Sequence, residues 1–231
     1  MVNTLNCIKS IILLFALFSC NDNRNITINQ VNKKTNNQET NIIDKADVYK
    51  VDNTWFIPKK SFEFNDSARI QGDTLTLITC ANFIYYPFGN IQEESFLKSP
   101  LLKELTATQK VAHVDENQFK YHLLQKDESK LLFLFKEQKP DEYWGSYIER
   151  GIINNSSIML SNGIRTGISI KEFYSKFFKQ VNQDLHSRVS IIILEPCISG
   201  NPRHVYNFTD QKLKQIKFEC IDSGCGKILD Y

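Results

Sequence analysis

Cysteine and histidine are the side chains of this chain with the greatest capacity for covalent chemistry. A cysteine nucleophile needs a base beside it, and histidine is the base whose pKa lies closest to neutral pH. No G-x-S-x-G step or similar motif joins a nucleophile to a base. The sequence therefore names no catalytic residue. A cell-envelope hydrolase whose catalytic residues form no recognisable motif is the alternative to a protein without catalysis. The side chains concerned are Cys80, Cys197, Cys220, Cys225, His113, His122, His186 and His204.

Metal and cofactor chemistry lacks its usual spacings. The chain has no H-E-x-x-H step, no EF-hand loop and no pair of C-x-x-C steps. With only 9 glycines it also has no glycine-rich phosphate loop. The acidic pairs Glu93–Glu94 and Asp141–Glu142 could serve a glycosidase only if two carboxylates faced each other across a cleft. Solvated turns explain them better, so we expect no metal and no cofactor.

Four cysteines of the expected domain form an even set, which in an exported protein permits two disulfides in three connectivities. Cys220 and Cys225 enclose the flexible sequence IDSG and could close a small loop. Cys197 and Cys220 end two expected strands and could also pair. The sequence leaves open which pairs form, with Cys80, Cys197, Cys220 and Cys225 as candidates and free buried thiols as the alternative.

Two aromatic clusters stand near expected turns, FIYYPFG at 83–89 and EYWGSY at 142–147. If exposed, such rings can bind the face of a sugar or anchor a partner protein. If buried, they are the edge of the core. The candidate binding residues are Tyr85, Tyr86, Trp144 and Tyr147. The net charge of +2 is nearly balanced and does not suggest a nucleic-acid partner.

The first twenty residues have the pattern of an export signal. Lys9 precedes an apolar run from Ile11 to Phe18, which is too short to span a membrane as a helix. The following Leu17, Ser19 and Cys20 resemble the lipobox of bacterial lipoproteins, while Phe18 departs from it. The resemblance implies removal of residues 1–19 and lipidation of Cys20, which anchors the protein to a membrane of the cell envelope. An ordinary secretory signal is the alternative.

The stretch 21–47 is rich in Asn, Gln, Thr and Lys and has no sustained apolar period. It predicts a flexible tether that, with Cys20, spans 20–47. The remaining residues, 48–231, contain enough apolar side chains for one globular domain.

Alternation and turn residues predict a strand-rich domain. Hairpins are expected at 118–125 with 130–138 and at 204–208 with 212–220, the second with a bulge near Gln215. The motif LLFLF at 131–135 predicts a central strand. Further strands are expected at 69–80, 82–89 and 188–196, and two short ones are expected within 146–163.

Helical signals are fewer. Ser169 and Glu172 form a capping box ahead of an apolar stripe that predicts a helix over 169–181. The stripe indicates a buried face, with a membrane-surface helix as the alternative. Pro100 after Ser99 suggests a second, short helix at about 100–109. We therefore expect an α+β fold with a largely antiparallel sheet packed by the helix at 169–181.

The step Gly167-Ile168-Ser169 and the later hairpin weakly resemble SmpA-type and β-lactamase-inhibitor-like envelope domains. This resemblance implies an α+β envelope domain and carries no catalytic residue. The sequence as a whole predicts a lipid-anchored envelope protein that binds another protein or a glycan without catalysis.

Overall fold

Twelve strands and three short helices make up the described part of the computed structural model. The structure describes residues 48–62, 64, 68–89, 95, 98–99, 105–114, 117–135 and 146–220. All of them belong to one compact unit. The expected signal, Cys20 and the tether lie outside the described residues. Among the helices described, none is long and apolar enough to cross a membrane.

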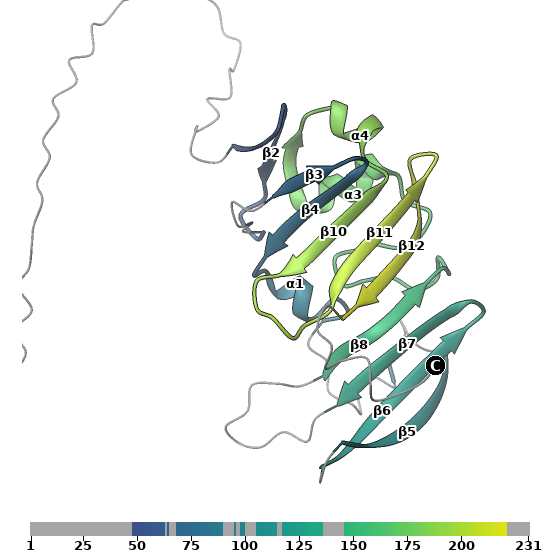
Figure 1. The fold of residues 1–231 in the computed structure, drawn as a ribbon. Coiled ribbons are helices and arrows are strands. Elements are labelled where there is room, and N and C mark those ends of the chain that lie inside the picture. Colours follow the sequence, from purple (N-terminus) through teal and green to yellow (C-terminus); the bar gives the residue numbers. More distant parts are fainter. Residues whose placement is uncertain are drawn as a thin grey trace, which may run out of the picture. The chain divides into compact units, whose positions relative to one another are not determined.

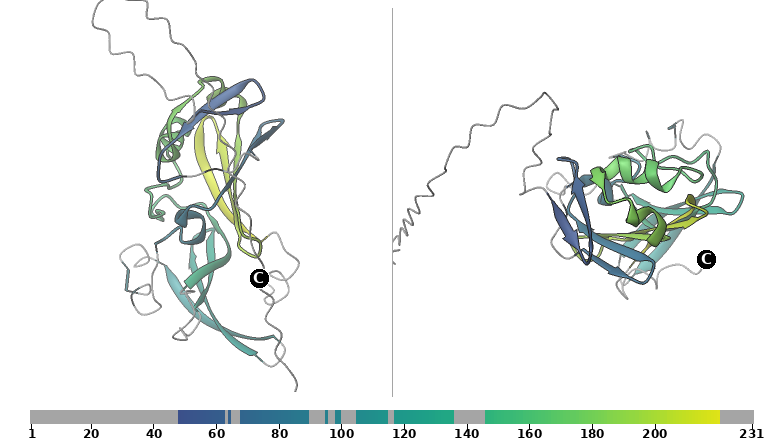
Figure 2. Two further views of the ribbon diagram at one scale, coloured as in Figure 1. Left: turned by 90° about the vertical axis from the view of Figure 1, so that its left-hand side faces the viewer. Right: turned by 90° about the horizontal axis from the view of Figure 1, so that it is seen from above.

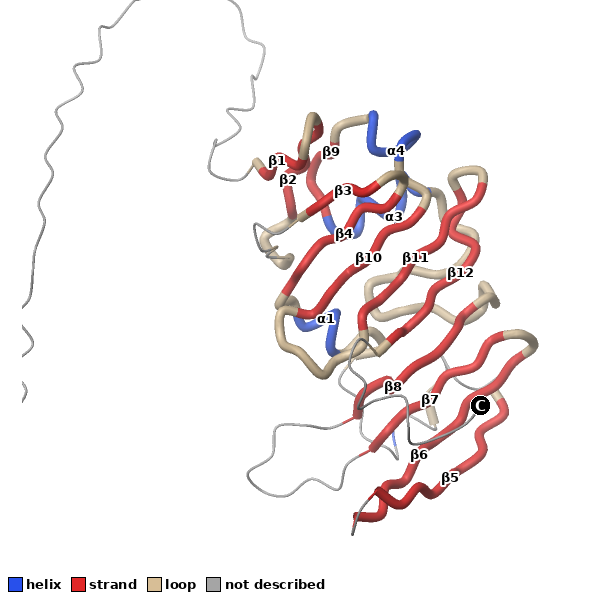
Figure 3. Tube along the Cα trace, viewed as in Figure 1, coloured by secondary structure: helices blue, strands red, loops and turns tan. Residues whose placement is uncertain are grey.

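Nine strands form one mixed sheet, in the order β3-β4-β10-β11-β12-β8-β7-β6-β5 (Figures 1 and 3). β4 and β10 run parallel, and every other adjacent pair of this sheet is antiparallel. The strands are β3 (Arg69–Gln71), β4 (Thr74–Thr79), β5 (Thr106–Val114), β6 (Asn117–Lys126), β7 (Ser129–Phe135), β8 (Ser146–Ile153), β10 (Ile191–Pro196), β11 (Arg203–Thr209) and β12 (Lys212–Glu219).

A smaller antiparallel sheet has the order β1-β2-β9. Its strands are β1 (Tyr49–Val51), β2 (Thr54–Pro58) and β9 (Phe178–Val181). The helices are α1 (Asn82–Tyr85), α3 (Ile170–Phe177) and α4 (Asp184–Arg188). The fold is α+β with large antiparallel sheets, as the sequence predicts at this level.

Figure 2 shows α3 against one side of the large sheet. Aromatic rings fill the space between the two. The ring of Phe173 lies 4.7 Å from that of Tyr206 and 5.3 Å from that of Phe208, both on β11. Phe177 extends the contact to Phe62 and Phe83. All six of these rings are buried. The apolar stripe of the helix is therefore core, as its spacing predicts.

Both predicted hairpins form. Strands β6 and β7 meet at Asp127 and Glu128, and β7 pairs with a neighbour on each side, so it is a central strand. Strands β11 and β12 meet at Asp210 and Gln211, whose φ angles of 49° and 58° are those of a type I′ turn. The register shifts between Asn207 and Phe208, opposite the stretch near Gln215 where a bulge was expected.

The helix start at Ser169 is also confirmed, because the Ser169 side chain accepts a hydrogen bond from the Glu172 N–H at 3.1 Å. The expected helix is nevertheless four residues too long. Residues 178–181 form β9, which pairs with β2 through Phe56↔Val181 and Ile57↔Gln180. Strand pairing therefore replaces the last turn, because Phe178 and Val181 suit a half-buried strand as well as a helix.

Three further expectations are wrong. The aromatic stretch after Cys80 begins with the helical turn α1, not with a strand, and buries Phe83 and Ile84 side by side. The expected helix at 100–109 is contradicted at its end, because Thr106 begins β5; residues 100–104 lie outside the described residues. Only one strand, β8, forms within 146–163, and residues 154–163 form neither a strand nor a helix.

Candidate functional site

A disulfide joins the carboxyl ends of the parallel strands β4 and β10. Cys80 and Cys197 are bonded, with their Cα atoms 5.1 Å apart and 117 positions apart in sequence. This differs from the pairing of Cys197 with Cys220 that the strand ends suggested. Cys220 is also disulfide-bonded, and Cys225 lies outside the described residues. The Cys80–Cys197 bond fixes the point where the chain leaves β4 and enters α1.

The chain after this disulfide forms one wall of a hollow of about 360 Å³. Figure 1 shows α1 at the ends of β4 and β10, where those strands point. The opposite wall is the turn at 161–162, more than seventy positions later in the sequence. The described residues that line the hollow are Asn82, Phe83, Tyr86, Gly89, Ser161 and Asn162.

Backbone hydrogen bonds hold the two walls together. The Ser161 N–H donates to the carbonyl of Pro87 at 2.7 Å, which ties the turn to the segment that follows α1. The turn itself is closed by bonds from Leu160 N–H to Ile164 and from Gly163 N–H to Leu160. Gly163 has a φ of +82°, a conformation that glycine adopts without strain.

The described lining combines two aromatic rings with amide and hydroxyl groups. Tyr86 is half-buried, Asn82 and Ser161 are exposed, and Phe83 contributes the edge of the core. The side-chain oxygen of Asn162 accepts a hydrogen bond from the Ile164 N–H at 3.2 Å. Its Nδ2 is buried and has no hydrogen-bond partner among the described residues. A buried donor left without a partner costs about 1–3 kcal/mol.

Of the four aromatic residues singled out in the sequence, the structure places one in this hollow. Tyr86 lines it. Tyr85 is half-buried elsewhere, with its hydroxyl 3.2 Å from the Cys197 sulfur, and burial raises the pKa of that hydroxyl. Tyr147 lies on β8, but the structure does not describe its side chain. Trp144 lies outside the described residues.

The described histidines serve packing. His204 on β11 is buried, and its Nδ1 lies 3.1 Å from the Tyr206 hydroxyl. Burial lowers the pKa of His204 to about 3, against a backbone contact with Ile84 that raises it. His122 is buried against the ring of Phe135. His186 stacks on Tyr174 at 5.4 Å, and burial lowers its pKa. The side chain of His113 lies outside the description.

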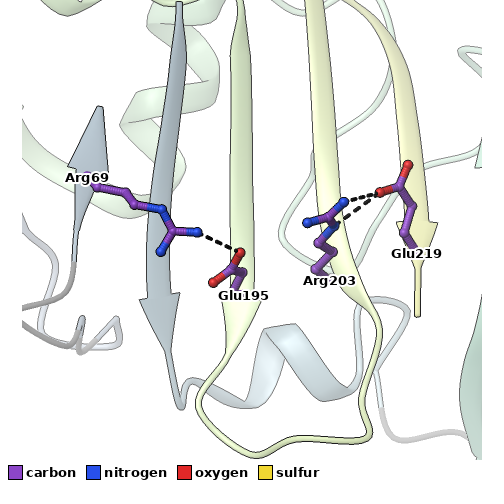
Figure 4. A network of polar contacts seen from close by, with 4 residues as sticks. All are labelled: Arg69, Glu195, Arg203 and Glu219. Atoms are coloured by element: carbon purple, nitrogen blue, oxygen red, sulfur yellow. Dashed lines mark hydrogen bonds and ion pairs between the residues drawn. The ribbon is translucent and has the colours of Figure 1, made fainter. Parts of the chain in front are cut away.

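A row of charges crosses the face of the large sheet that α3 does not contact (Figure 4). Arg69 lies 3.3 Å from Glu195, and Arg203 donates from Nε and Nη2 to one oxygen of Glu219 at 3.1 and 2.9 Å. Arg203 and Glu219 are direct cross-strand partners. Exposed pairs of this kind stabilise by up to about 1 kcal/mol each.

No protein-family model matches the chain, and no curated protein or solved structure matches it. Among the described residues, no three His, Cys, Asp or Glu side chains group closely enough to hold a metal ion. Function must therefore be argued from the geometry of the site.

The sequence alone could flag Tyr86 but not its partners in the hollow. Asn82, Ser161 and Asn162 belong to no motif, and asparagine is common throughout the chain. The signal that would have found them is the contact between Ser161 and Pro87, which only the fold creates.

Proposed function

We propose that this chain is a lipid-anchored protein of the cell envelope whose domain, with its sheet packed by α3, binds a glycan in the hollow beside Tyr86. The observation that carries the proposal is the composition of the hollow, in which an aromatic ring stands among two asparagines and a serine. The anchor rests on the lipobox-like residues that end at Cys20.

Sugars present two kinds of surface, and this hollow offers a partner for each. The C–H face of a pyranose ring is apolar and packs on an aromatic face, which Tyr86 can supply. The hydroxyl and acetamido groups at the ring edge both donate and accept hydrogen bonds. Asn82, Ser161 and Asn162 carry amide and hydroxyl groups that do the same. The volume falls in the range of small-ligand pockets.

Binding to neutral oligosaccharides tests the proposal. Titration of the protein with chitotetraose and with maltotetraose, followed by NMR, should perturb the amide signals of 82–89 and 161–163. Tyr86→Ala removes the stacking surface and should weaken the affinity about five- to thirtyfold, since stacking and burial of one ring contribute on the order of 1–2 kcal/mol.

Asn162→Asp isolates the amide donor. This change keeps the oxygen that accepts from Ile164 but removes Nδ2, so it should weaken binding while leaving the turn in place. Gln180→Glu is the matched control, because it makes the same chemical change at an exposed position of β9. Tyr49→Ala is the control for Tyr86, because Tyr49 is a half-buried tyrosine that does not line the hollow.

Either of two results would reject glycan binding at this site. One is an absence of shifts at 82–89 and 161–163 with both sugars. The other is equal affinity in wild type, Tyr86→Ala and Asn162→Asp, all shown to be folded by thermal unfolding.

A further inference from the structure

A second cleft lies on the large sheet and shares no described residue with the hollow. It has a volume of about 450 Å³. Strands β7, β8 and β12 supply its described lining, which consists of Lys130, Arg150, Gly151, Ile152, Lys217, Phe218 and Glu219.

Strand register places two of its lysines on either side of an isoleucine. Lys217 on β12 pairs with Ile152 on β8, and Ile152 pairs with Lys130 on β7. Side chains directly opposite in antiparallel strands stand on one face, with Cβ atoms roughly 5 Å apart. The two lysines therefore flank Ile152 in one row, about 10 Å from each other.

Within the described part of the chain, no carboxylate is paired with either lysine of this row. The carboxylate of Glu219 lies at the same cleft but is engaged by Arg203. The two lysines therefore make this row of the described lining positively charged.

The floor between the lysines is apolar and has room above it. Ile152 is 38% exposed, so its apolar side chain can be reached from solvent. An apolar group between two unpaired cations suits a molecule that has an apolar body and an anionic end.

We propose that this cleft binds a small amphiphilic carboxylate, with its apolar body on Ile152 and its carboxylate between Lys130 and Lys217. The inference does not depend on the glycan site, because the two sites have no lining residue in common.

Three probes separate the parts of this proposal. Octanoate has both the chain and the charge, acetate has the charge alone, and octylammonium has the chain with the opposite charge. We expect NMR shifts at residues 130, 150–152 and 217–219 with octanoate, and affinity at least about tenfold weaker for each of the other two probes.

A double substitution tests the two lysines. K130Q/K217Q should weaken octanoate binding about tenfold, the fold-change that corresponds to the loss of two half-exposed ion pairs. The matched control is K60Q/K214Q, which removes the same charge from two exposed lysines outside the cleft and should leave the affinity unchanged. Thermal unfolding checks that both variants fold.

Several outcomes would overturn the proposal. Octylammonium binding as tightly as octanoate would show that the cations play no part. Equal affinity for acetate and octanoate would show that Ile152 plays none. Equal weakening by K130Q/K217Q and K60Q/K214Q would reduce the effect to net charge.

Discussion

Gly151 lies at a tightly packed position of the large sheet, and its replacement by alanine should destabilise the fold. It lies on β8 opposite Leu131 on β7 and Phe218 on β12. A Cβ at this position would lie 2.6 Å from Leu131 Cδ2, 2.8 Å from the Lys130 carbonyl oxygen and 3.2 Å from Leu131 Cα. Two of these three atoms belong to the backbone, so rotation of a side chain cannot remove the clash.

The magnitude follows from two opposing terms. Overpacking that forces a backbone shift costs about 1–3 kcal/mol. Alanine also reduces the entropy of the unfolded chain, which recovers about 0.4–1 kcal/mol. Gly151 is not among the described glycines with positive φ, so no backbone strain is added. We expect Gly151→Ala to lower the free energy of unfolding by about 1–2 kcal/mol.

Urea unfolding followed by circular dichroism measures this change, and two variants assign its cause. Gly72→Ala places a Cβ where no atom lies within 4 Å but where φ is +62°, so it reports backbone strain without a clash. In the double variant Leu131→Ala/Gly151→Ala, the Leu131 Cδ2 atom is gone but the Lys130 carbonyl oxygen still crowds the new Cβ. The destabilisation by Gly151→Ala should therefore be smaller, but not absent, when Leu131 is already alanine. Unchanged stability of Gly151→Ala, or strictly additive effects in the double variant, would refute the reasoning.

Two further predictions concern a buried base and the proposed anchor. Because the unfolded chain protonates histidine below a pH of about 6.5 while burial lowers the pKa of His204 to about 3, the unfolded state binds more protons, and stability should fall as the pH falls through that window. The slope from this residue approaches about 1.4 kcal/mol per pH unit. His204→Gln should flatten the curve, whereas equal slopes in the two proteins would contradict the burial argument. Cys20→Ala should abolish lipidation and shift the protein from the detergent phase to the aqueous phase in phase partition; an unchanged phase and an unchanged mass of the mature N-terminus would contradict the anchor.

Local signals in the sequence predicted how elements begin better than where they end. Ser169 marks the start of α3 because a cap depends on its nearest neighbours alone. The end of α3 depends on β2, which lies more than a hundred positions earlier in the chain. At 82–85 the aromatic residues favoured a strand by propensity, but a helical turn buries Phe83 and Ile84 together beside the disulfide. At 106–109, pairing with β6 prevailed over the helical signal from Pro100.

The sites show the same division between local and distant information. Alternation along β12 indicates that Lys217 faces away from the core, and the hairpin indicates the same for Lys130. Neither reveals that β8 lies between them, because β12 pairs with β8 across about sixty positions of sequence. The parallel contact of β4 with β10 is equally non-local. It brings Cys80 to Cys197, a pairing that cysteine spacing alone left among several.

The placement of the histidines bears on the choice between binding and hydrolysis. A catalytic base must reach the proton that it removes, yet His122 and His204 are 4% and 0% exposed. A base with a pKa of about 3, as His204 has, is also too weak to activate a hydroxyl at neutral pH. Of the histidine side chains that the structure describes, only His186 is partly exposed. It stacks on Tyr174, where burial, with a smaller contribution from nearby Lys171, lowers its pKa.

Neither the hollow nor the cleft has a described histidine in its lining. The groups that do line them act through stacking, hydrogen bonds and charge, which are the interactions that the two binding proposals use.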